Sequence, residues 1–230
     1  MIGPSNAWDA VFFDLDGTLA DTAPDLGGAL NRVRIEEGCS ALELDVLRRV
    51  TSQGVRGLLR VGFGLAPTDP DYAPLAARVL AHYSGSLCVG TQLFAGVAEL
   101  LADIESSGMR WGVVTNKAAR FTIPVMDGLG LLSRAACVVS GDSAPQPKPA
   151  AAPLLLACTI AGALPSRCMY IGDDLRDVQA GRGCGMTTVA VRYGYHGDGP
   201  PIEDWGADHL VDRPLQIARL LGIAGARMPH

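Results

Sequence analysis

Two carboxylates lie close together near the start of the chain, at Asp14 and Asp16 in the stretch FFDLDGTLADT. They follow the apolar run Ala10–Phe13, and Gly17 and Thr18 come directly after them. In an extended chain alternate side chains share a face, so both acids can face one ligand. Two unit charges about 4 Å apart repel by roughly 4 kcal/mol at an effective dielectric constant of about 20. The spacing therefore predicts that a positive group lies between them.

The elements that must position these acids are short apolar runs, continuous rather than alternating, as expected of strands buried on both faces. Helix-like stretches lie between the runs, for example GVAELLADIESSG at residues 96–108. This alternation predicts βαβ units and an α/β fold with a Rossmann-like, doubly wound parallel sheet. The predicted strands are Ala10–Phe13, Arg110–Thr115, Ala136–Ser140, Cys168–Gly172 and Thr187–Tyr193, with a short further strand in ADHLVD at residues 207–212.

Residues 21–89 have a different pattern. They contain no strand-like run, and apolar residues such as Leu26, Leu30 and Val33 recur at helical spacing. We therefore expect a helical domain of residues 21–89, inserted just after the first strand. The α/β core domain is expected to comprise residues 1–20 and 90–230.

Ligands of an open parallel sheet bind beyond the carboxyl ends of its strands. The polar residues that follow four of the predicted strands should therefore converge on one edge. Four of them are carboxylates and one is a lysine, so we expect the cluster to recruit a cation, and an all-oxygen site suits Mg²⁺. In chain order these residues are Asp14, Asp16, Thr18, Thr115, Asn116, Lys148, Asp173 and Asp177.

Four ordered motifs carry a family resemblance. They are DLDGT at residues 14–18, TN at 115–116, KP at 148–149 and GDDLRD at 172–177. Each lies at a predicted strand end, and together they resemble the four motifs of the haloacid dehalogenase (HAD) superfamily, over essentially the whole chain. The helical insertion resembles the type-1 cap of that family. The resemblance implies a phosphatase with an α/β core and a helical cap.

The resemblance also implies a role for the first two motifs. Asp14 would attack phosphorus and form an aspartyl-phosphate, which splits one difficult step into two. Asp16 would protonate the leaving alcohol and then deprotonate the attacking water. Thr18 would help to position Asp16. Thr115 and the backbone of Asn116 would bind the phosphoryl oxygens.

The last two motifs would balance the charge. By the resemblance, Lys148 offsets negative charge on the nucleophile and the phosphate in the transition state. Asp174 is expected to cap the helix that follows it, and Lys117, Arg176 and Arg182 are expected to be solvated. The implied ligands of Mg²⁺ are Asp14, the backbone carbonyl of Asp16 and Asp173, with Asp177 supporting them.

Two subgroups of the family are similar to this sequence. The stretch DLDGTLADTAPDL at residues 14–26 resembles the phosphoglycolate phosphatases. The stretches WGVVTNK, GDDLRD and VRYGYH also resemble the N-acetylmuramic acid 6-phosphate phosphatases. The first resemblance implies a Mg²⁺-dependent phosphomonoester hydrolase of the phosphoglycolate phosphatase type that acts on a small phosphorylated metabolite. The second stays as the alternative.

Substrate choice is expected to depend on the cap. In its loop Thr51–Leu59, Arg56 is the residue that we expect to meet an anionic group of the substrate. Both candidate substrates carry a carboxylate, so Arg56 does not separate them. The cap is expected to close over the substrate about hinges near Ala20–Asp21 and Gly90–Phe94.

Three other classes use related residues. A dehalogenase would use the first aspartate on carbon, and the presence of Asp16 argues against it. A phosphomutase shares the motifs but must shield the aspartyl-phosphate from water. A receiver-like, non-enzymatic phospho-acceptor module also gathers acids near a lysine, but such modules are shorter and have no cap.

Composition limits the partners. The 230 residues carry a formal charge of −5 and no block of lysine or arginine, so we expect no nucleic-acid partner. No apolar run approaches about 20 residues, which argues against a membrane span, and the N-terminal residues do not resemble a signal peptide. The six cysteines lie far apart, as is typical of small buried residues in a reducing cytoplasm. Monomer and homodimer both remain open.

Overall fold

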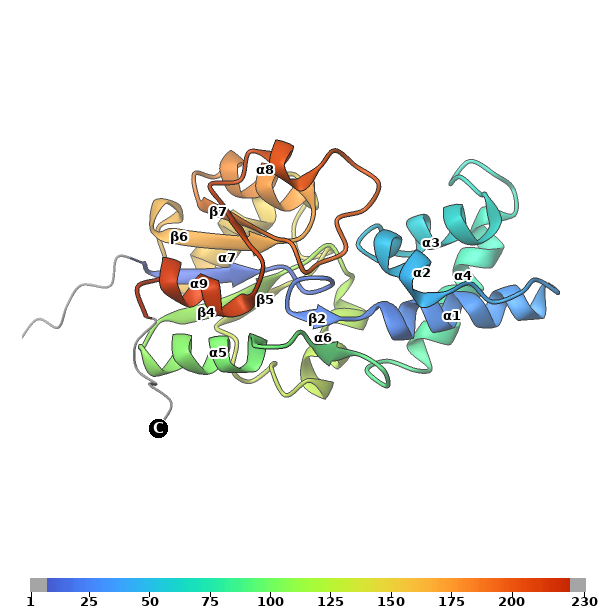
Figure 1. Ribbon diagram of the computed structural model, residues 1–230, viewed down its shortest axis with the longest axis horizontal. Coiled ribbons are helices and arrows are strands. Elements are labelled where there is room, and N and C mark those ends of the chain that lie inside the picture. Colours follow the sequence, from blue (N-terminus) through green and yellow to red (C-terminus); the bar gives the residue numbers. More distant parts are fainter. Residues whose placement is uncertain (1–7, 224–230) are drawn as a thin grey trace, which may run out of the picture.

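The computed structural model describes residues 8–223. Residues 1–7, on which the signal-peptide interpretation rests, and residues 224–230 lie outside the described part. Within it, six parallel strands form one sheet in the order β5-β4-β1-β6-β7-β8 (Figure 1). This arrangement confirms the predicted doubly wound sheet. The strands are β1 (Ala10–Phe13), β4 (Arg110–Val114), β5 (Cys137–Val139), β6 (Cys168–Gly172), β7 (Thr187–Val191) and β8 (His209–Val211).

The strands are buried because helices cover both faces of the sheet (Figure 1). In β1, Val11 and Phe13 pack with α5, α6 and α9, whereas Ala10 and Phe12 pack on the opposite face with α7 and α8. Both sets of side chains are apolar, which explains why the strand reads as a continuous apolar run. The covering helices are α5 (Val97–Ser106), α6 (Ala119–Gly128), α7 (Ala152–Ala161), α8 (Leu175–Gly183) and α9 (Pro214–Leu220).

Some predicted strand ends are too long. The run Thr187–Tyr193 is regular only to Val191, although the N–H of Arg192 still donates to the carbonyl of Val211 at 2.8 Å. The second predicted strand likewise ends at Val114 rather than at Thr115. In both cases the first residue after the strand still donates its N–H to the neighbouring strand.

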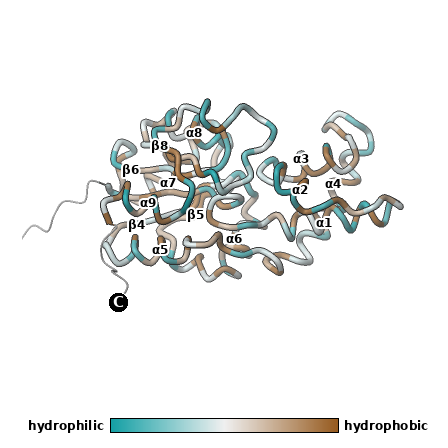
Figure 2. The backbone as a smooth tube through the Cα atoms, in the orientation of Figure 1, coloured by the Kyte–Doolittle hydropathy of each residue, from teal (hydrophilic) through white to brown (hydrophobic). Residues whose placement is uncertain are grey.

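Four helices between the first and second strands of the sheet form a unit with its own hydrophobic cluster, which we call the helical insert (residues 23–84). Leu30, Leu47, Leu58 and Val79, one from each helix, are all fully buried there. The apolar face of each helix therefore packs on the other helices, and Figure 2 shows hydrophobic segments in the insert as well as in the sheet. The helices are α1 (Ala23–Glu36), α2 (Leu44–Thr51), α3 (Gly54–Phe63) and α4 (Tyr72–Ser84).

Two short strands, which the sequence did not predict, join the insert to the sheet. They are β2 (Ala20–Asp21) and β3 (Gln92–Leu93), and they pair antiparallel. The chain thus enters and leaves the insert through one narrow connection, at the two segments expected to act as hinges. The domain boundaries at residues 21 and 89 stay a prediction.

The cysteines differ in part from the expectation. All six carry free thiols, but Cys39 is exposed and only three are buried. Among residues 8–223, no helix combines the length and the apolar character that crossing a bilayer requires.

The packing of α5 on the sheet gives a test of the fold. Leu100 is fully buried in the cluster between α5 and the sheet. We expect Leu100→Ala to lower the free energy of unfolding by about 2–5 kcal/mol, because it removes apolar contacts and leaves a cavity. Leu215→Ala, at a position half exposed on α9, should change it by no more than about 0.5 kcal/mol. Urea denaturation measures both, and equal losses would contradict this packing.

Candidate active site

Asp14 occupies the position directly beyond the carboxyl end of β1. Its N–H donates to the carbonyl of Ile171 at 2.8 Å, so the backbone is still held against β6 there. The chain then turns at Gly17, which has a φ of +88°. That turn ends the strand and leaves the Asp14 side chain at the edge of the sheet, where the neighbouring strands also end.

Three buried carboxylates meet at this edge. Asp14, Asp173 and Asp177 each offer an oxygen atom, and these oxygens lie within 4.8 Å of one another. Burial, together with the charges of Asp14 and Asp177, raises the pKa of Asp173 well above its usual range. Burial also raises the pKa of Asp177 to about 6, although the neighbouring Lys148 lowers it. The cluster therefore resists carrying all of its negative charges at once.

Asp173 is held from three directions. One carboxylate oxygen accepts hydrogen bonds from the N–H of Tyr195 at 2.8 Å and from the hydroxyl of Ser52 at 3.1 Å. The other oxygen accepts a hydrogen bond from the hydroxyl of Thr18 at 3.1 Å. Ser52 follows α2, so the helical insert contacts the acid cluster directly.

Lys148 supplies positive charge inside the cluster. Its ammonium lies 2.9 Å from a carboxylate oxygen of Asp14 and 2.7 Å from one of Asp177. It also donates to the carbonyl of Val114 and to the hydroxyl of Tyr170. Burial lowers the pKa of Lys148, but the two carboxylates outweigh burial and raise it overall. The lysine is therefore a fixed charge.

One ammonium does not balance three carboxylates, so the cluster keeps an excess of negative charge. Oδ1 of Asp14 is buried and accepts no hydrogen bond from the described residues, although it faces Lys148. Three clustered carboxylates whose one ammonium neighbour cannot balance them have the oxygen donors that a hard divalent cation prefers. The cluster of Asp14, Asp173 and Asp177 therefore fits a divalent metal ion.

The residues at the end of β4 line the same site. Thr115 is buried, and its N–H donates to the carbonyl of Val139. The side chain of Asn116 forms two hydrogen bonds of 2.9 Å with the backbone of Lys148, one to its carbonyl and one from its N–H. Asn116 therefore fixes the segment that carries the lysine, a contact that the sequence did not reveal.

Asp16 has partners that differ from those expected. Its carboxylate accepts hydrogen bonds from the hydroxyl of Thr22 and from the ammonium of Lys117, the latter at 2.8 Å. The expected contact from Thr18 is not what the structure shows, since that hydroxyl donates to Asp173. Thr22 is the residue that orients Asp16, because the tight turn brings the chain back past it.

The expectation that Lys117 is solvated was wrong. Its side chain is only 6% exposed, and its ammonium also lies 4.9 Å from the centre of the Tyr83 ring on α4. Burial lowers the pKa of Lys117, but the Asp16 carboxylate outweighs burial and raises it overall. Its place in the sequence could have predicted this, because Lys117 lies just beyond the end of β4, where the site is formed.

At the end of β6, the structure confirms the predicted role of Asp174 and contradicts the prediction for Arg176. Asp174 caps α8 as predicted, accepting a hydrogen bond from the N–H of Arg176, while Asp177 accepts one from the N–H of Asp174. Arg176 was expected to be solvated. It is instead half-buried, paired with Asp174, and it donates to the carbonyl of Ser52 at 2.8 Å. Arg182 is exposed, as expected.

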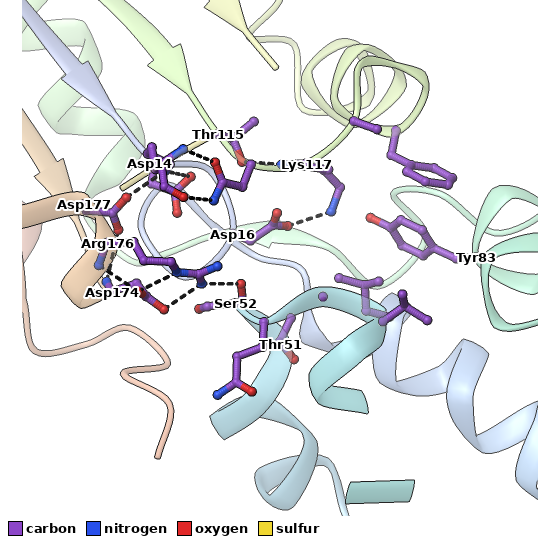
Figure 3. Close-up of a pocket in the computed structure, with 18 of the residues that line it drawn as sticks. Asp14, Asp16, Thr51, Ser52, Tyr83, Thr115, Lys117, Asp174, Arg176 and Asp177 are labelled. Atoms are coloured by element: carbon purple, nitrogen blue, oxygen red, sulfur yellow. Dashed lines mark hydrogen bonds and ion pairs between the residues drawn. The ribbon is translucent and has the colours of Figure 1, made fainter. Parts of the chain in front are cut away.

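A cavity of about 380 Å³ lies between the acid cluster and the helical insert. Figure 3 shows Asp14 and Asp177 on one side of it and Tyr83, from the insert, on the other. Arg56 does not take its expected place here, because α3 directs it to the solvent side, where it lines a neighbouring cavity of about 400 Å³. The residues around the main cavity that the sequence did not assign to the site include Leu26, Leu80, Tyr83, Lys117, Arg120, Phe121 and Arg176.

The turn after Asp14 gives a test of this geometry. A Cβ atom on Gly17 would lie 2.0 Å from an Asp173 oxygen, and the positive φ would strain any other residue. We expect Gly17→Ala to cost about 1–3 kcal/mol of stability and most of the turnover. Gly28→Ala on α1, where a Cβ meets nothing within 4 Å, serves as the control and should leave both unchanged or gain stability. Full turnover of Gly17→Ala would contradict the geometry.

Comparison with known proteins assigns this site to a family. The sequence pattern of the haloacid dehalogenase-like hydrolases matches residues 11–191. The chain is 42% identical to an N-acetylmuramic acid 6-phosphate phosphatase of Pseudomonas putida, over 94% of this chain and 96% of the relative. It is 40% identical to a phosphoglycolate phosphatase of Xanthomonas campestris, over 90% and 94%.

The fold is also similar to that of solved structures. A solved structure described as a predicted phosphoglycolate phosphatase from Haemophilus somnus superposes with a TM-score of 0.83 at 24% identity, covering 94% of this chain and 99% of that one. At that identity the superposition supports the fold alone. Together with the sequence relatives, these findings show that the chain belongs to the haloacid dehalogenase-like hydrolases and is a phosphatase.

Proposed function

We propose that this phosphatase is a Mg²⁺-dependent phosphomonoester hydrolase of the phosphoglycolate phosphatase type, which works through an aspartyl-phosphate on a small phosphorylated metabolite. The observation that carries the proposal is the buried pair of Asp14 and Lys148 at one end of the cavity, with Asp173 directly behind it. A buried carboxylate held beside an ammonium stays ionised and is an available nucleophile.

In the first step, a carboxylate oxygen of Asp14 bonds to phosphorus and the bond from phosphorus to the leaving oxygen breaks. Asp16 enters this step protonated and gives that proton to the leaving oxygen, which departs as an alcohol. Lys148 offsets the negative charge that builds up on the phosphoryl group. Thr115 and the backbone of Asn116 would bind the phosphoryl oxygens from the end of β4.

In the second step, water attacks the aspartyl-phosphate. Asp16, now ionised, takes a proton from that water, the bond from phosphorus to Asp14 breaks, and inorganic phosphate leaves. Thr22 and Lys117 hold the Asp16 carboxylate in one position through both steps. Thr18 contributes indirectly, because its hydroxyl orients Asp173.

A divalent metal ion completes the charge balance. When bound, Mg²⁺ would neutralise the carboxylates and the incoming phosphate and so lower their mutual repulsion. Asp14, the backbone carbonyl of Asp16 and Asp173 would hold it, with Asp177 in support. The fit rests on the clustered oxygens and on the raised pKa values of Asp173 and Asp177.

One observation favours a larger substrate as a second candidate. The cavity of about 380 Å³ corresponds to roughly a dozen water molecules at about 30 Å³ each, which is more room than the phosphoester of a two-carbon acid fills. Its lining includes the apolar side chains of Leu26, Leu80 and Phe121, which suits a bulky leaving group. N-acetylmuramic acid 6-phosphate, the substrate named for the Pseudomonas relative, has that size.

Closure of the insert over the substrate belongs to the same proposal. Residues 21–89 would move as a cap about the paired strands β2 and β3. Two kinds of contact between the insert and the core support such a movement. Ser52 forms hydrogen bonds with Asp173 and Arg176, and Arg60 on α3 forms an ion pair with Asp198. These contacts couple the position of the insert to the acid cluster.

The nucleophile gives the first test of the proposal. Asp14→Asn removes the attacking carboxylate with little change of shape, so we expect release of phosphate from p-nitrophenyl phosphate to fall at least about 10⁴-fold while the protein stays folded. Asp9→Asn, just before the same strand, is the control and should retain activity. EDTA should abolish wild-type turnover and Mg²⁺ should restore it. Retained turnover in Asp14→Asn would contradict the mechanism.

The metal ligands give a test that depends on pH. The folded-state pKa of Asp173 and Asp177 is raised, so in metal-free protein these groups favour folding at low pH. That contribution disappears as pH rises from their unfolded value of about 3.9 through the folded one, about 6 for Asp177. Mg²⁺ replaces the protons, so the gain in Tm that it causes should be small at pH 5 and larger at pH 7.5.

Asp173→Asn supplies the matched comparison. It removes one carboxylate from the cluster, so its Tm should respond little to Mg²⁺ at either pH. Differential scanning fluorimetry with and without Mg²⁺ measures the shift. The same Mg²⁺-dependent gain in wild type and variant would show that the ion binds elsewhere.

A further inference from the structure

A buried polar group that the mechanism does not use faces the cavity. Tyr83, at the end of α4, is 1% exposed, and the proton of its hydroxyl has no acceptor among the described residues, although the ammonium of Lys117 lies close enough to interact with its oxygen. Figure 3 shows this hydroxyl pointing from the insert toward Asp16 and Lys117. A buried hydroxyl whose proton has no acceptor is costly unless a ligand supplies one, so Tyr83 indicates a position for a hydrogen-bond acceptor of the substrate.

Lys117 provides donors at the same position. The chain has only two lysines, and the other, Lys148, is bound to Asp14 and Asp177. An ammonium carries three N–H donors, and the structure directs one of those of Lys117 to Asp16. The ammonium nitrogen itself lies over the Tyr83 ring, 4.9 Å from its centre, on the side of Asp16 away from Asp14 (Figure 3).

The position of Tyr83 and Lys117 relative to Asp16 decides which part of the substrate they contact. Asp16 faces the leaving oxygen in the proposed mechanism, so the groups beyond Asp16 face the leaving group and not the phosphoryl group. Arg120, stacked on Phe121 at 4.7 Å, lines the same end of the cavity. Lys117, Arg120 and Tyr83 all offer hydrogen-bond donors at this end. The nearby carboxylate, Asp16, is already paired with Lys117.

We infer that Lys117 and Tyr83 bind a carboxylate carried by the leaving group. An anionic oxygen would accept from the Tyr83 hydroxyl and from a free N–H of Lys117, and the apolar side chains of Leu80 and Phe121 would strengthen both bonds by excluding water. This inference rests on the proposed function, since it takes the position of the leaving group from the role of Asp16. It assigns to Lys117 and Tyr83 the contact that the sequence led us to expect of Arg56.

The carboxylate can come from two sources. It lies next to the ester carbon in a 2-phospho acid such as phosphoglycolate, and it lies on the lactyl ether of N-acetylmuramic acid 6-phosphate. Each has a counterpart that differs at the carboxylate-bearing group: ethyl phosphate for the first, and N-acetylglucosamine 6-phosphate for the second. Values of kcat/KM for the two pairs therefore identify the source, because only the recognised pair should show a preference for its acid.

The test compares Tyr83→Phe with Tyr72→Phe. The first removes only the hydroxyl that faces the cavity, and the second removes a hydroxyl from the other end of the same helix. For the recognised pair, we expect Tyr83→Phe to lower kcat/KM for the acid about tenfold or more, mainly through KM, as loss of a hydrogen bond to a charged group implies. The carboxylate-free counterpart should change less than twofold, and Tyr72→Phe should change neither.

Lys117→Gln gives a second readout. This substitution disturbs Asp16 as well, so kcat/KM falls for both members of the pair. The fall for the acid should be at least tenfold greater than the fall for its carboxylate-free counterpart. An equal loss for both members in Lys117→Gln and in Tyr83→Phe would overturn the inference, as would wild-type enzyme that shows no preference for either acid. If p-nitrophenyl phosphate is not hydrolysed by wild type at all, the proposed function itself fails, and the two failures are thereby distinguished.

Discussion

Repulsion among buried carboxylates is the constraint on which the rest of this structure depends. Asp14, Asp173 and Asp177 place oxygens within 4.8 Å of one another, and Lys148 is the ammonium that contacts two of them. Burying unbalanced charge is unfavourable. The cluster therefore favours binding of a further positive charge beside the cavity. A divalent ion would neutralise these carboxylates, and a phosphoryl group could then approach a site that would otherwise repel it.

The fold explains how such a cluster can be held. Parallel strands β1 and β6 are neighbours, so the residues after them meet without any bend in the sheet. At the end of β6, a Cβ atom on Gly172 would lie 2.3 Å from the side chain of Asp177, so only glycine lets the acid pack against the strand. The rigid sheet fixes the acids, whereas the helical insert contributes Ser52 and Tyr83, whose position depends on how the insert sits over the cavity.

The fold and the acids were predictable from the sequence because both follow from local pattern and topology. Continuous apolar runs gave the strands, and the polar residues after them fell on one edge, as they must in a parallel sheet. Side-chain partners were not predictable. Lys117 looked like a solvated loop residue because nothing local shows that Tyr83, 34 positions earlier, covers it. Arg56 was placed in the site by its charge and its position in the expected cap loop Thr51–Leu59, yet the direction in which α3 presents it depends on packing within the insert.

Diffraction from crystals soaked in Mn²⁺, which scatters anomalously and resembles Mg²⁺ in its preference for oxygen ligands, tests the central claim most directly. The account predicts an anomalous peak in contact with carboxylate oxygens of both Asp14 and Asp173, at a coordination distance slightly above the 2.0–2.1 Å typical of Mg²⁺. No peak between those two side chains in crystals that bind Mn²⁺ elsewhere would contradict it.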